Sequence, residues 1–124
     1  MTTRLLIVDD NALVRTELRS ILELAGSVAV IGEAMDGWDA LRQAEALQPD
    51  IVLMDLKMPG LNGFETTRQL KANHLAQTVI VFTVYGSAAN QQKAKEAGAD
   101  AFMIKGASLQ TILSIFDQFT HQEA

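Results

Sequence analysis

Four of the five apolar runs in this chain end on a side chain that could take part in phosphoryl chemistry, and the fifth ends on a glycine. The four are Leu5–Val8 before Asp9-Asp10, Ile51–Met54 before Asp55, Val79–Phe82 before Thr83 and Ala101–Ile104 before Lys105. In a parallel α/β sheet the carboxyl ends of the strands meet at one edge, and ligands bind there. The pattern therefore predicts that three carboxylates, one hydroxyl and one ammonium group converge on a single crevice.

The three aspartates, Asp9, Asp10 and Asp55, point to a bound cation. At about 4–5 Å from one another they would repel by several kcal/mol per pair, so they must either take up protons or bind a positive ion. Hard oxygen ligands with an open side suit Mg²⁺, which favours phosphate oxygens as further ligands. We therefore predict a magnesium-assisted phosphoryl site. The alternative is that Asp10 and Asn11 merely cap the following helix.

Asp55 is the candidate nucleophile, because a carboxylate can accept a phosphoryl group to form an acyl phosphate. It could instead be a second metal ligand, or serve both purposes with its two oxygens. Lys105 could pair with Asp55 or with a phosphoryl oxygen. Thr83 could offer its hydroxyl to the same group, although threonine is common in strands for reasons of propensity alone.

The elements that would position these residues alternate regularly along the chain. Strands are expected at 4–9, 28–31, 51–54, 78–83 and 101–104, and helices at 12–25, 38–47, 64–73 and 87–97. A last helix is expected to follow Ser108, its N-cap, and to run to about His121. The strands are continuous apolar runs, which is typical of parallel strands covered by helices on both faces. With right-handed crossovers, the expected fold is a flavodoxin-like, doubly wound (βα)5 α/β domain with strand order 2-1-3-4-5. The first and third strands then flank the switch point, and the second falls at an edge.

Length and composition agree with one domain over residues 1–124. The net charge of −5 argues against binding nucleic acid through the overall field of the domain. The chain has no cysteine, no apolar run approaches the roughly 20 residues that span a bilayer, and Met-Thr-Thr-Arg leaves no room for a signal peptide before the first strand. We expect a cytoplasmic domain that contacts no membrane.

Together these residues resemble the receiver domain of two-component response regulators, over the whole chain. The motifs that carry the resemblance are Leu6-Ile7-Val8-Asp9-Asp10, Asp55-Leu56-Lys57-Met58-Pro59-Gly60 with Asn62-Gly63, Phe82-Thr83, and Lys105. The stretch Val30-Ile31-Gly32-Glu33-Ala34, with Asp36-Gly37, further resembles the NarL/LuxR-type branch, whose members usually carry a C-terminal helix-turn-helix.

The resemblance implies that Asp55 receives a phosphoryl group from a histidine kinase or from a small donor such as acetyl phosphate. It implies that Asp10, Asp55 and the main-chain carbonyl of Lys57 hold Mg²⁺, with Asp9 helping through water. Lys105 would contact the phosphoryl group. Such a domain catalyses its own modification and is not a multiple-turnover metabolic enzyme.

The resemblance also implies a switch and a set of partners. Thr83 would move towards the phosphoryl group while Phe102 turns inward, which would alter the face formed by the fourth helix, the fifth strand and the fifth helix. The implied partners are a sensor histidine kinase and a DNA-binding domain beyond this sequence, and the implied role is regulation of transcription. A homodimer is an open alternative to the single chain.

Three positions depart from the common receiver pattern. Gly106 follows Lys105 where many receivers have a proline, which leaves the geometry of that peptide bond open. Val84 follows Thr83 where many have a smaller residue, so we expect slower phosphorylation by small donors. Phe102 replaces a frequent tyrosine, so its ring has no hydroxyl to donate.

Several side chains outside the acidic site have an expected burial or location. The last helix would bury one face, and Ile115 and Phe119 would widen it into a core stripe or a docking edge. Trp38 is expected to be partly buried, His74 and His121 to be solvated, and Tyr85 to border the pocket or lie on a loop surface. The buried face of the last helix comprises Leu109, Ile112, Leu113 and Phe116.

Three other functions fit parts of the sequence. A flavin-binding module shares the fold class, but Asp9-Asp10-Asn11 would repel the flavin phosphate. A phosphatase of the haloacid dehalogenase type needs an acid two residues after its nucleophile, where this chain has Lys57. A degenerate receiver that acts only as a protein-binding module is disfavoured by the complete set of site residues.

Overall fold

Five strands and five helices alternate in the computed structural model, which describes residues 2–26 and 28–120. The strands and helices are β1 (Thr3–Val8), α1 (Ala12–Ala25), β2 (Val28–Ala34), α2 (Gly37–Leu47), β3 (Ile51–Met54), α3 (Gly63–Ala72), β4 (Thr78–Thr83), α4 (Ala88–Ala97), β5 (Ala101–Ile104) and α5 (Leu109–Thr120). Every expected element is present, and most ends agree within one residue. The expected end of the last helix at His121 lies outside the described residues.

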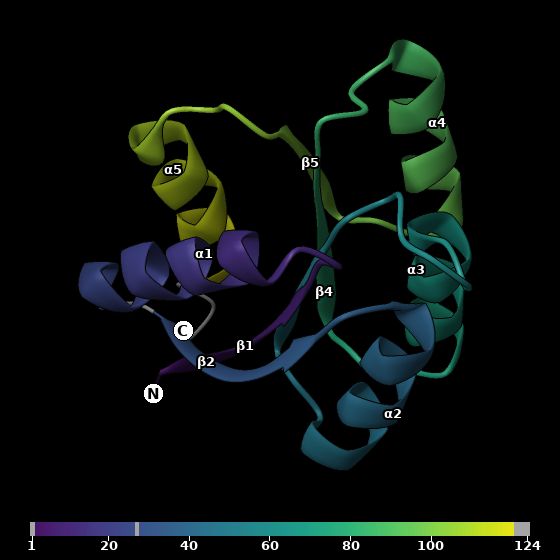
Figure 1. Ribbon diagram of the computed structural model, residues 1–124, viewed down its shortest axis with the longest axis horizontal. Coiled ribbons are helices and arrows are strands. Elements are labelled where there is room, and N and C mark those ends of the chain that lie inside the picture. Colours follow the sequence, from purple (N-terminus) through teal and green to yellow (C-terminus); the bar gives the residue numbers. More distant parts are fainter. Residues whose placement is uncertain (1, 27, 121–124) are drawn as a thin grey trace.

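The strands form one parallel sheet in the order β2-β1-β3-β4-β5, as predicted. Helices α1 and α5 cover one face of this sheet, and α2, α3 and α4 cover the other (Figure 1). Strands β2 and β3 lie on opposite sides of β1, so the strand order reverses there and the switch point falls between β1 and β3. Ligands bind at such a point in doubly wound sheets.

The continuous apolar strands are explained by the two layers of helices. Alternate residues of β1 point to opposite faces. Leu5 and Ile7 join a buried cluster with residues of α1 and α5, which include Leu18, Leu22, Ile112 and Phe116. Leu6 and Val8 join a second cluster, whose members from α2 and α3 include Ala40, Ala44 and Leu70. Both faces of the sheet are therefore covered by apolar side chains, and the polar residues of the site lie at the strand ends.

Strand β2 is longer than predicted, running from Val28 to Ala34 instead of ending at Ile31. Leu5 pairs with Val30 and Leu6 with Gly32, so Ile31 is an extra residue in the pairing with β1. The strand continues past this irregularity and past Glu33. The prediction stopped at Ile31 because the run of apolar residues ends there. Its far end therefore lies beside the end of β1.

Two predicted burials are wrong. Leu109, expected in the core, is 51% exposed because it begins α5 before the helix packs on the sheet. Trp38, expected to be partly buried, is 61% exposed, and its indole ring lies over Gly60 in the loop between β3 and α3. Ser108 caps α5 as expected, since its Oγ accepts the Thr111 amide at 3.1 Å. His74 is exposed, also as expected.

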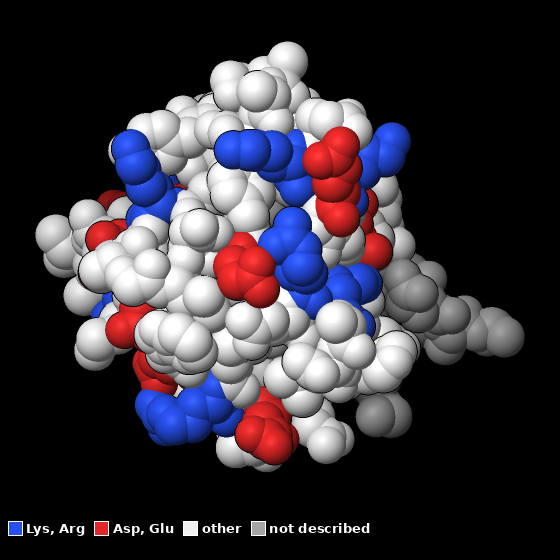
Figure 2. All heavy atoms as spheres, turned by 90° about the vertical axis from the view of Figure 1, so that its right-hand side faces the viewer, with Lys and Arg blue, Asp and Glu red and all other residues white. Residues whose placement is uncertain are grey.

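The side covered by α3 and α4 carries basic and acidic side chains next to one another (Figure 2). On α3, Arg68 Nη1 lies 2.6 Å from Glu65 Oε1. Lys93 and Glu96 of α4 line a shallow hollow together with this pair. This face therefore has no dominant sign of charge. None of the helices described is long and apolar enough to cross a bilayer.

Candidate functional site

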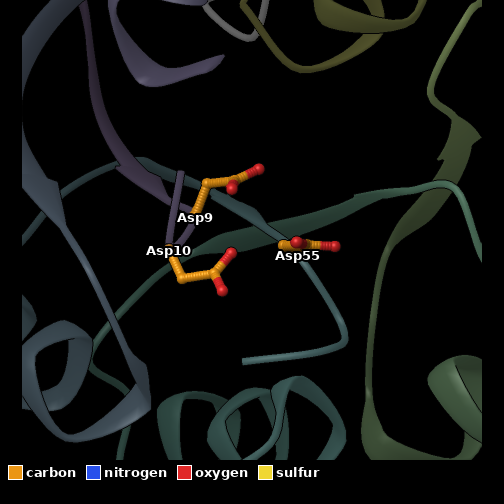
Figure 3. Close-up of side chains that lie close together, drawn as sticks. All are labelled: Asp9, Asp10 and Asp55. Atoms are coloured by element: carbon orange, nitrogen blue, oxygen red, sulfur yellow. The ribbon is translucent and has the colours of Figure 1, made fainter. Parts of the chain in front are cut away.

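The three predicted aspartates lie together at the carboxyl edge of the sheet. Residues Val8 of β1 and Met54 of β3 are paired, so the residues that follow them, Asp9 and Asp55, are neighbours. One carboxylate oxygen each of Asp9, Asp10 and Asp55 can be chosen such that all three lie within 4.8 Å of one another. Figure 3 shows the three side chains extending from the ends of β1 and β3 to the same side. Asp9 and Asp55 are buried, whereas Asp10 is exposed.

Lys105 reaches the same point from the end of β5. Its Nζ lies 2.7 Å from Asp9 Oδ2 and 3.4 Å from Asp55 Oδ2. The Lys105 amide donates to the Thr83 carbonyl at 2.8 Å, which continues the pairing of β4 and β5 to the rim of the site. The predicted pairing with Asp55 is present, but the shorter contact is with Asp9.

The turn between β1 and α1 is built by its own side chains. Asn11 caps α1, because its Oδ1 accepts the Leu13 amide at 2.9 Å and the Val14 amide at 3.3 Å. The Asn11 amide in turn donates to Asp9 Oδ1 at 2.9 Å. The capping role is thus filled by Asn11, and the Asp10 carboxylate is available at the open side of the cluster.

Asp55 is held by the backbone on both sides. Its amide donates to the Val8 carbonyl at 3.0 Å, and its Oδ1 accepts the Leu56 amide at 2.8 Å. Gly63, the first residue of α3, lies so close to the Asp55 carbonyl that a Cβ there would overlap it. The other carboxylate oxygen, Oδ2, faces Lys105. One oxygen of Asp55 is therefore fixed by the backbone, and the other faces the centre of the site.

The electrostatics of the site favour a cation. Burial raises the pKa of Asp55, the nearby charge of Lys105 lowers it, and the charge of Asp9 raises it again, so that the net pKa is above its usual value. Hydrogen bonds from the Leu56 amide and the Thr83 hydroxyl favour the ionised form. For Lys105, burial lowers the pKa, but the hydrogen bond to Asp9 and the two carboxylate charges outweigh burial and raise the pKa. The negative charge exceeds what one lysine neutralises.

An open hollow of about 410 Å³ lies above the cluster. Lys57 and Tyr85 both line it, and the Lys57 ammonium lies 4.6 Å from the centroid of the Tyr85 ring. Tyr85 thus borders the pocket, one of its two predicted positions. Thr83 is fully buried, and its Oγ1 accepts the Tyr85 amide at 3.2 Å. The hollow is lined by Asp9, Asp10, Asn11, Val14, Asp55, Lys57, Met58, Pro59, Val84, Tyr85 and Lys105.

The remaining predicted positions lie beside the site. Phe102 is partly buried against a small cluster formed by Leu56, Val81 and Ala94, on the face of the sheet that α4 covers. Gly106 has a φ of 102°, a left-handed conformation that glycine adopts without strain. The described residues contain no cis peptide bond, so the bond after Lys105 is trans.

Two residues behind the site, Arg15 and Glu33, were not predicted from the sequence. Arg15 of α1 donates from Nη1 to the Asp9 carbonyl at 2.5 Å, and its Nε lies 3.1 Å from Glu33 Oε1 on β2. A basic residue one turn into the helix after the acidic pair was the available signal. Glu33 was hidden because β2 was predicted to end before it.

Comparison with known proteins agrees with this geometry. Residues 5–117 match the family model of the response regulator receiver domain. The nitrate/nitrite response regulator protein NarL of Escherichia coli K12 is 33% identical over 92% of this chain and 53% of its own length. The response regulator GacA of Pseudomonas aeruginosa is 39% identical over 93% of this chain and 54% of its own. The chain spans about half the length of these curated relatives.

Solved structures give the same result. A LuxR-family two-component response regulator from Aurantimonas superposes with a TM-score of 0.88 at 34% identity, covering 95% of this chain and 84% of that one. A signal receiver domain of a NarL regulator from Mycobacterium tuberculosis gives a TM-score of 0.90 at 28% identity, with 98% of both chains covered. The acidic cluster, its lysine and the parallel sheet that carries them are thus those of a known signalling module, and the chain belongs to the receiver domain family of two-component response regulators.

Proposed function

We propose that Asp55 is the phosphoryl acceptor of this receiver domain and that residues 1–124 form one switch unit. The observation that carries the proposal is the position of the Lys105 ammonium, within 3.4 Å of Asp55 Oδ2 and at hydrogen-bond distance from Asp9. A carboxylate facing a fixed ammonium on the floor of an open hollow is well placed to attack an incoming phosphorus. Lys105 then compensates charge on the transferred group.

Phosphoryl transfer to Asp55 takes place between the donor and the residues of the site. An Asp55 carboxylate oxygen attacks the phosphorus of a phosphohistidine or of an acyl phosphate. A P–O bond forms to Asp55 as the bond to the donor breaks, and the donor imidazole or carboxylate leaves with the electron pair. Lys105 contacts the phosphoryl oxygens, and the Thr83 hydroxyl, whose hydrogen bonding lowers the pKa of Asp55, donates to another of them.

Mg²⁺ is the cofactor that fits the donor set. The three carboxylates within 4.8 Å are hard oxygen ligands with more negative charge than Lys105 balances, and the exposed side at Asp10 leaves room for water and phosphate ligands. Asp10, Asp55 and the Lys57 main-chain carbonyl would hold the ion, with Asp9 acting through water. When bound, Mg²⁺ would supply positive charge at the phosphoryl oxygens.

The proposed switch uses the connections of Thr83. Its hydroxyl holds the Tyr85 amide, so a movement of Thr83 towards a phosphoryl group would pull the loop that leads into α4. Phe102 lies partly buried on the neighbouring strand, where it could fill the space that Thr83 leaves. The readout would be the face formed by α4, β5 and α5.

The proposed partners are a sensor histidine kinase as donor and an output domain that follows this one. This chain covers about half of relatives named as response regulators, and one relative, YdfI of Bacillus subtilis, is named a transcriptional regulatory protein. We therefore propose that the domain controls transcription through an attached DNA-binding domain and takes no direct part in DNA contact. Dimerisation through the switched face is a further part of this proposal.

The test is phosphorylation by acetyl phosphate with and without Mg²⁺, read by intact mass. Wild type should gain one phosphoryl group only with Mg²⁺, Asp55→Asn should gain none, and Asp39→Asn should behave as wild type because Asp39 lies on α2 away from the hollow. Beryllofluoride should bind wild type and not Asp55→Asn. A phosphoryl group that persists in Asp55→Asn would reject the assignment.

A further inference from the structure

Two arginines of α1 share one carboxylate, but only one of them reaches the acidic site. Arg15 Nε lies 3.1 Å from Glu33 Oε1, and Arg19 Nε lies 2.8 Å from Glu33 Oε2. Arg15 also donates from Nη1 to the Asp9 carbonyl at 2.5 Å. Arg19 turns its Nη1 the other way, towards the Val30 carbonyl and Glu23. The two residues are therefore alike in partner and chemistry, and differ in their contact with the site.

The Asp9 carbonyl that Arg15 holds belongs to the peptide between Asp9 and Asp10. A peptide is planar, so fixing this oxygen fixes the direction in which the chain leaves for Asp10. The amide side of Asp9 is held separately, by the Ala34 carbonyl at 3.1 Å. The amide and the carbonyl of Asp9 are thus both tied to β2, the amide directly and the carbonyl through Arg15 and Glu33.

The ion pair between Arg15 and Glu33 is strengthened by its partial burial and by the charge of both groups. The Arg15 side chain is only 15% exposed, and the Glu33 side chain 27%. The hydrogen bond from Arg19 lowers the pKa of Glu33, burial raises it, and Arg15 lowers it further, with a net pKa below its usual value. Glu33 therefore stays ionised at neutral pH, and the charge-assisted bonds to both guanidinium groups persist.

We propose that Arg15 is a positioning residue for the acidic site, in which its guanidinium, anchored on Glu33, orients the Asp9–Asp10 peptide so that both carboxylates face the ion held with Asp55. The metal readout of this inference rests on the proposed function. The positioning itself does not, because it is argued from the contacts of Arg15 with Glu33 and with the Asp9 carbonyl.

Charge and geometry predict opposite effects at Arg15, which makes the inference testable. A positive charge behind the cluster repels a cation, so loss of charge alone would tighten metal binding. Arg15→Lys keeps the charge but loses the planar fork that spans Glu33 and the Asp9 carbonyl. If Arg15 positions the site, Arg15→Lys weakens metal binding, by about 10-fold on the scale of other residues that orient metal ligands.

The experiment compares wild type, Arg15→Lys, the charge-removing variant Arg15→Met and the matched control Arg19→Lys. Binding of Mn²⁺, which takes the same kind of oxygen ligands as Mg²⁺, is measured from the electron paramagnetic resonance signal of the free ion. Hydrogen exchange of the Asn11 amide, which donates to Asp9 Oδ1, is measured without metal. Thermal melts check that each variant is folded, and Glu33→Gln, which weakens the anchor and keeps Arg15, serves as a second variant.

We expect weaker Mn²⁺ binding and faster Asn11 exchange in Arg15→Lys and Glu33→Gln, with Arg19→Lys close to wild type. Equal exchange and equal Mn²⁺ affinity in Arg15→Lys and Arg19→Lys would overturn the inference. So would tighter binding in Arg15→Met with unchanged binding in Arg15→Lys, because charge would then explain the effect. If wild type itself bound no Mn²⁺, the proposed metal site would fail, and the exchange data alone would decide whether Arg15 orients the turn.

Discussion

Lys105 and Asp9 are 96 positions apart in the chain, yet Nζ of one lies 2.7 Å from Oδ2 of the other. The contact joins the end of β5 to the end of β1, which are separated in the sheet by β3 and β4. Asp55, at the end of β3, lies between them and shares the same ammonium. One lysine therefore connects both carboxylates that are buried at the switch point of the sheet.

Replacing this lysine should cost both stability and phosphorylation. Lys105→Met leaves Asp9 and Asp55 without their counter-charge. Because the Lys105 side chain is still partly exposed, we expect a loss of about 1–2 kcal/mol at neutral pH, below the cost of breaking a fully buried pair. Phosphorylation by acetyl phosphate should fall by at least about 100-fold, as for the loss of a charge-stabilising donor. Urea unfolding and intact mass measure the two effects.

Lys71→Met is the control, since Lys71 pairs with Asp100 at 2.8 Å outside the hollow. It should lose some stability and keep normal phosphorylation. The raised pKa of Lys105 means that wild type holds the stabilising contribution of this ion pair at neutral pH and loses it only as pH rises past the ordinary lysine value of 10.5. Normal phosphorylation of Lys105→Met would contradict the role assigned to the ammonium.

Asp55→Asn should stabilise the metal-free protein at neutral pH. The folded pKa of Asp55 is above its ordinary value, so the folded state binds the proton more tightly, and its stability declines as pH rises through the folded pKa. The neutral amide avoids that cost. We expect a gain of about 1 kcal/mol, or roughly 3–5 °C in Tm, near pH 7, shrinking towards pH 3. A lower Tm for Asp55→Asn at pH 7 would contradict the direction of the shift.

Added Mg²⁺ should make wild type more stable than Asp55→Asn. A ligand that binds only the folded state stabilises it by about 2.7 kcal/mol at 100 times its Kd. Wild type should therefore gain Tm with increasing Mg²⁺, whereas Asp55→Asn and Asp10→Asn should gain much less, because each lacks one carboxylate of the cluster. Thermal melts over a Mg²⁺ series, with NaCl at matched ionic strength as the control, measure this. Equal gains in wild type and both variants would show that the ion binds elsewhere.

The site residues at the strand ends could be predicted from the sequence, whereas the contact that supports them from α1 could not. Because parallel strands all end at one edge, apolar runs followed by Asp55 and Lys105 were enough to place both in one crevice. The Arg15 contact to the Asp9 carbonyl could not be read in the same way, because it depends on the length of β2 and on the irregularity at Ile31. Exposure of Trp38 likewise depends on the path of a loop, which local patterning does not specify.

Gly63→Ala should disturb both the fold and the site. A Cβ added at Gly63 would overlap the Asp55 carbonyl and lie 2.7 Å from Leu56 Cα. These are backbone atoms that cannot turn aside, so we expect a loss of about 1–3 kcal/mol. Phosphorylation should fall as well, because Asp55 must shift. Gly26→Ala, strained at φ 82° but with open space around it, should lose stability and keep phosphorylation.

Val84→Ala should speed phosphorylation by small donors. Val84 is 60% exposed and lines the hollow above Asp55, so its branched side chain narrows the approach of acetyl phosphate. The truncation removes no buried contact, and stability should stay within about 0.5 kcal/mol of wild type. We expect a rate increase of about 3-fold to 10-fold, measured by intact mass against time, with Leu24→Ala, 88% exposed on α1, as the control. An unchanged rate in Val84→Ala would show that access past this side chain does not limit the reaction.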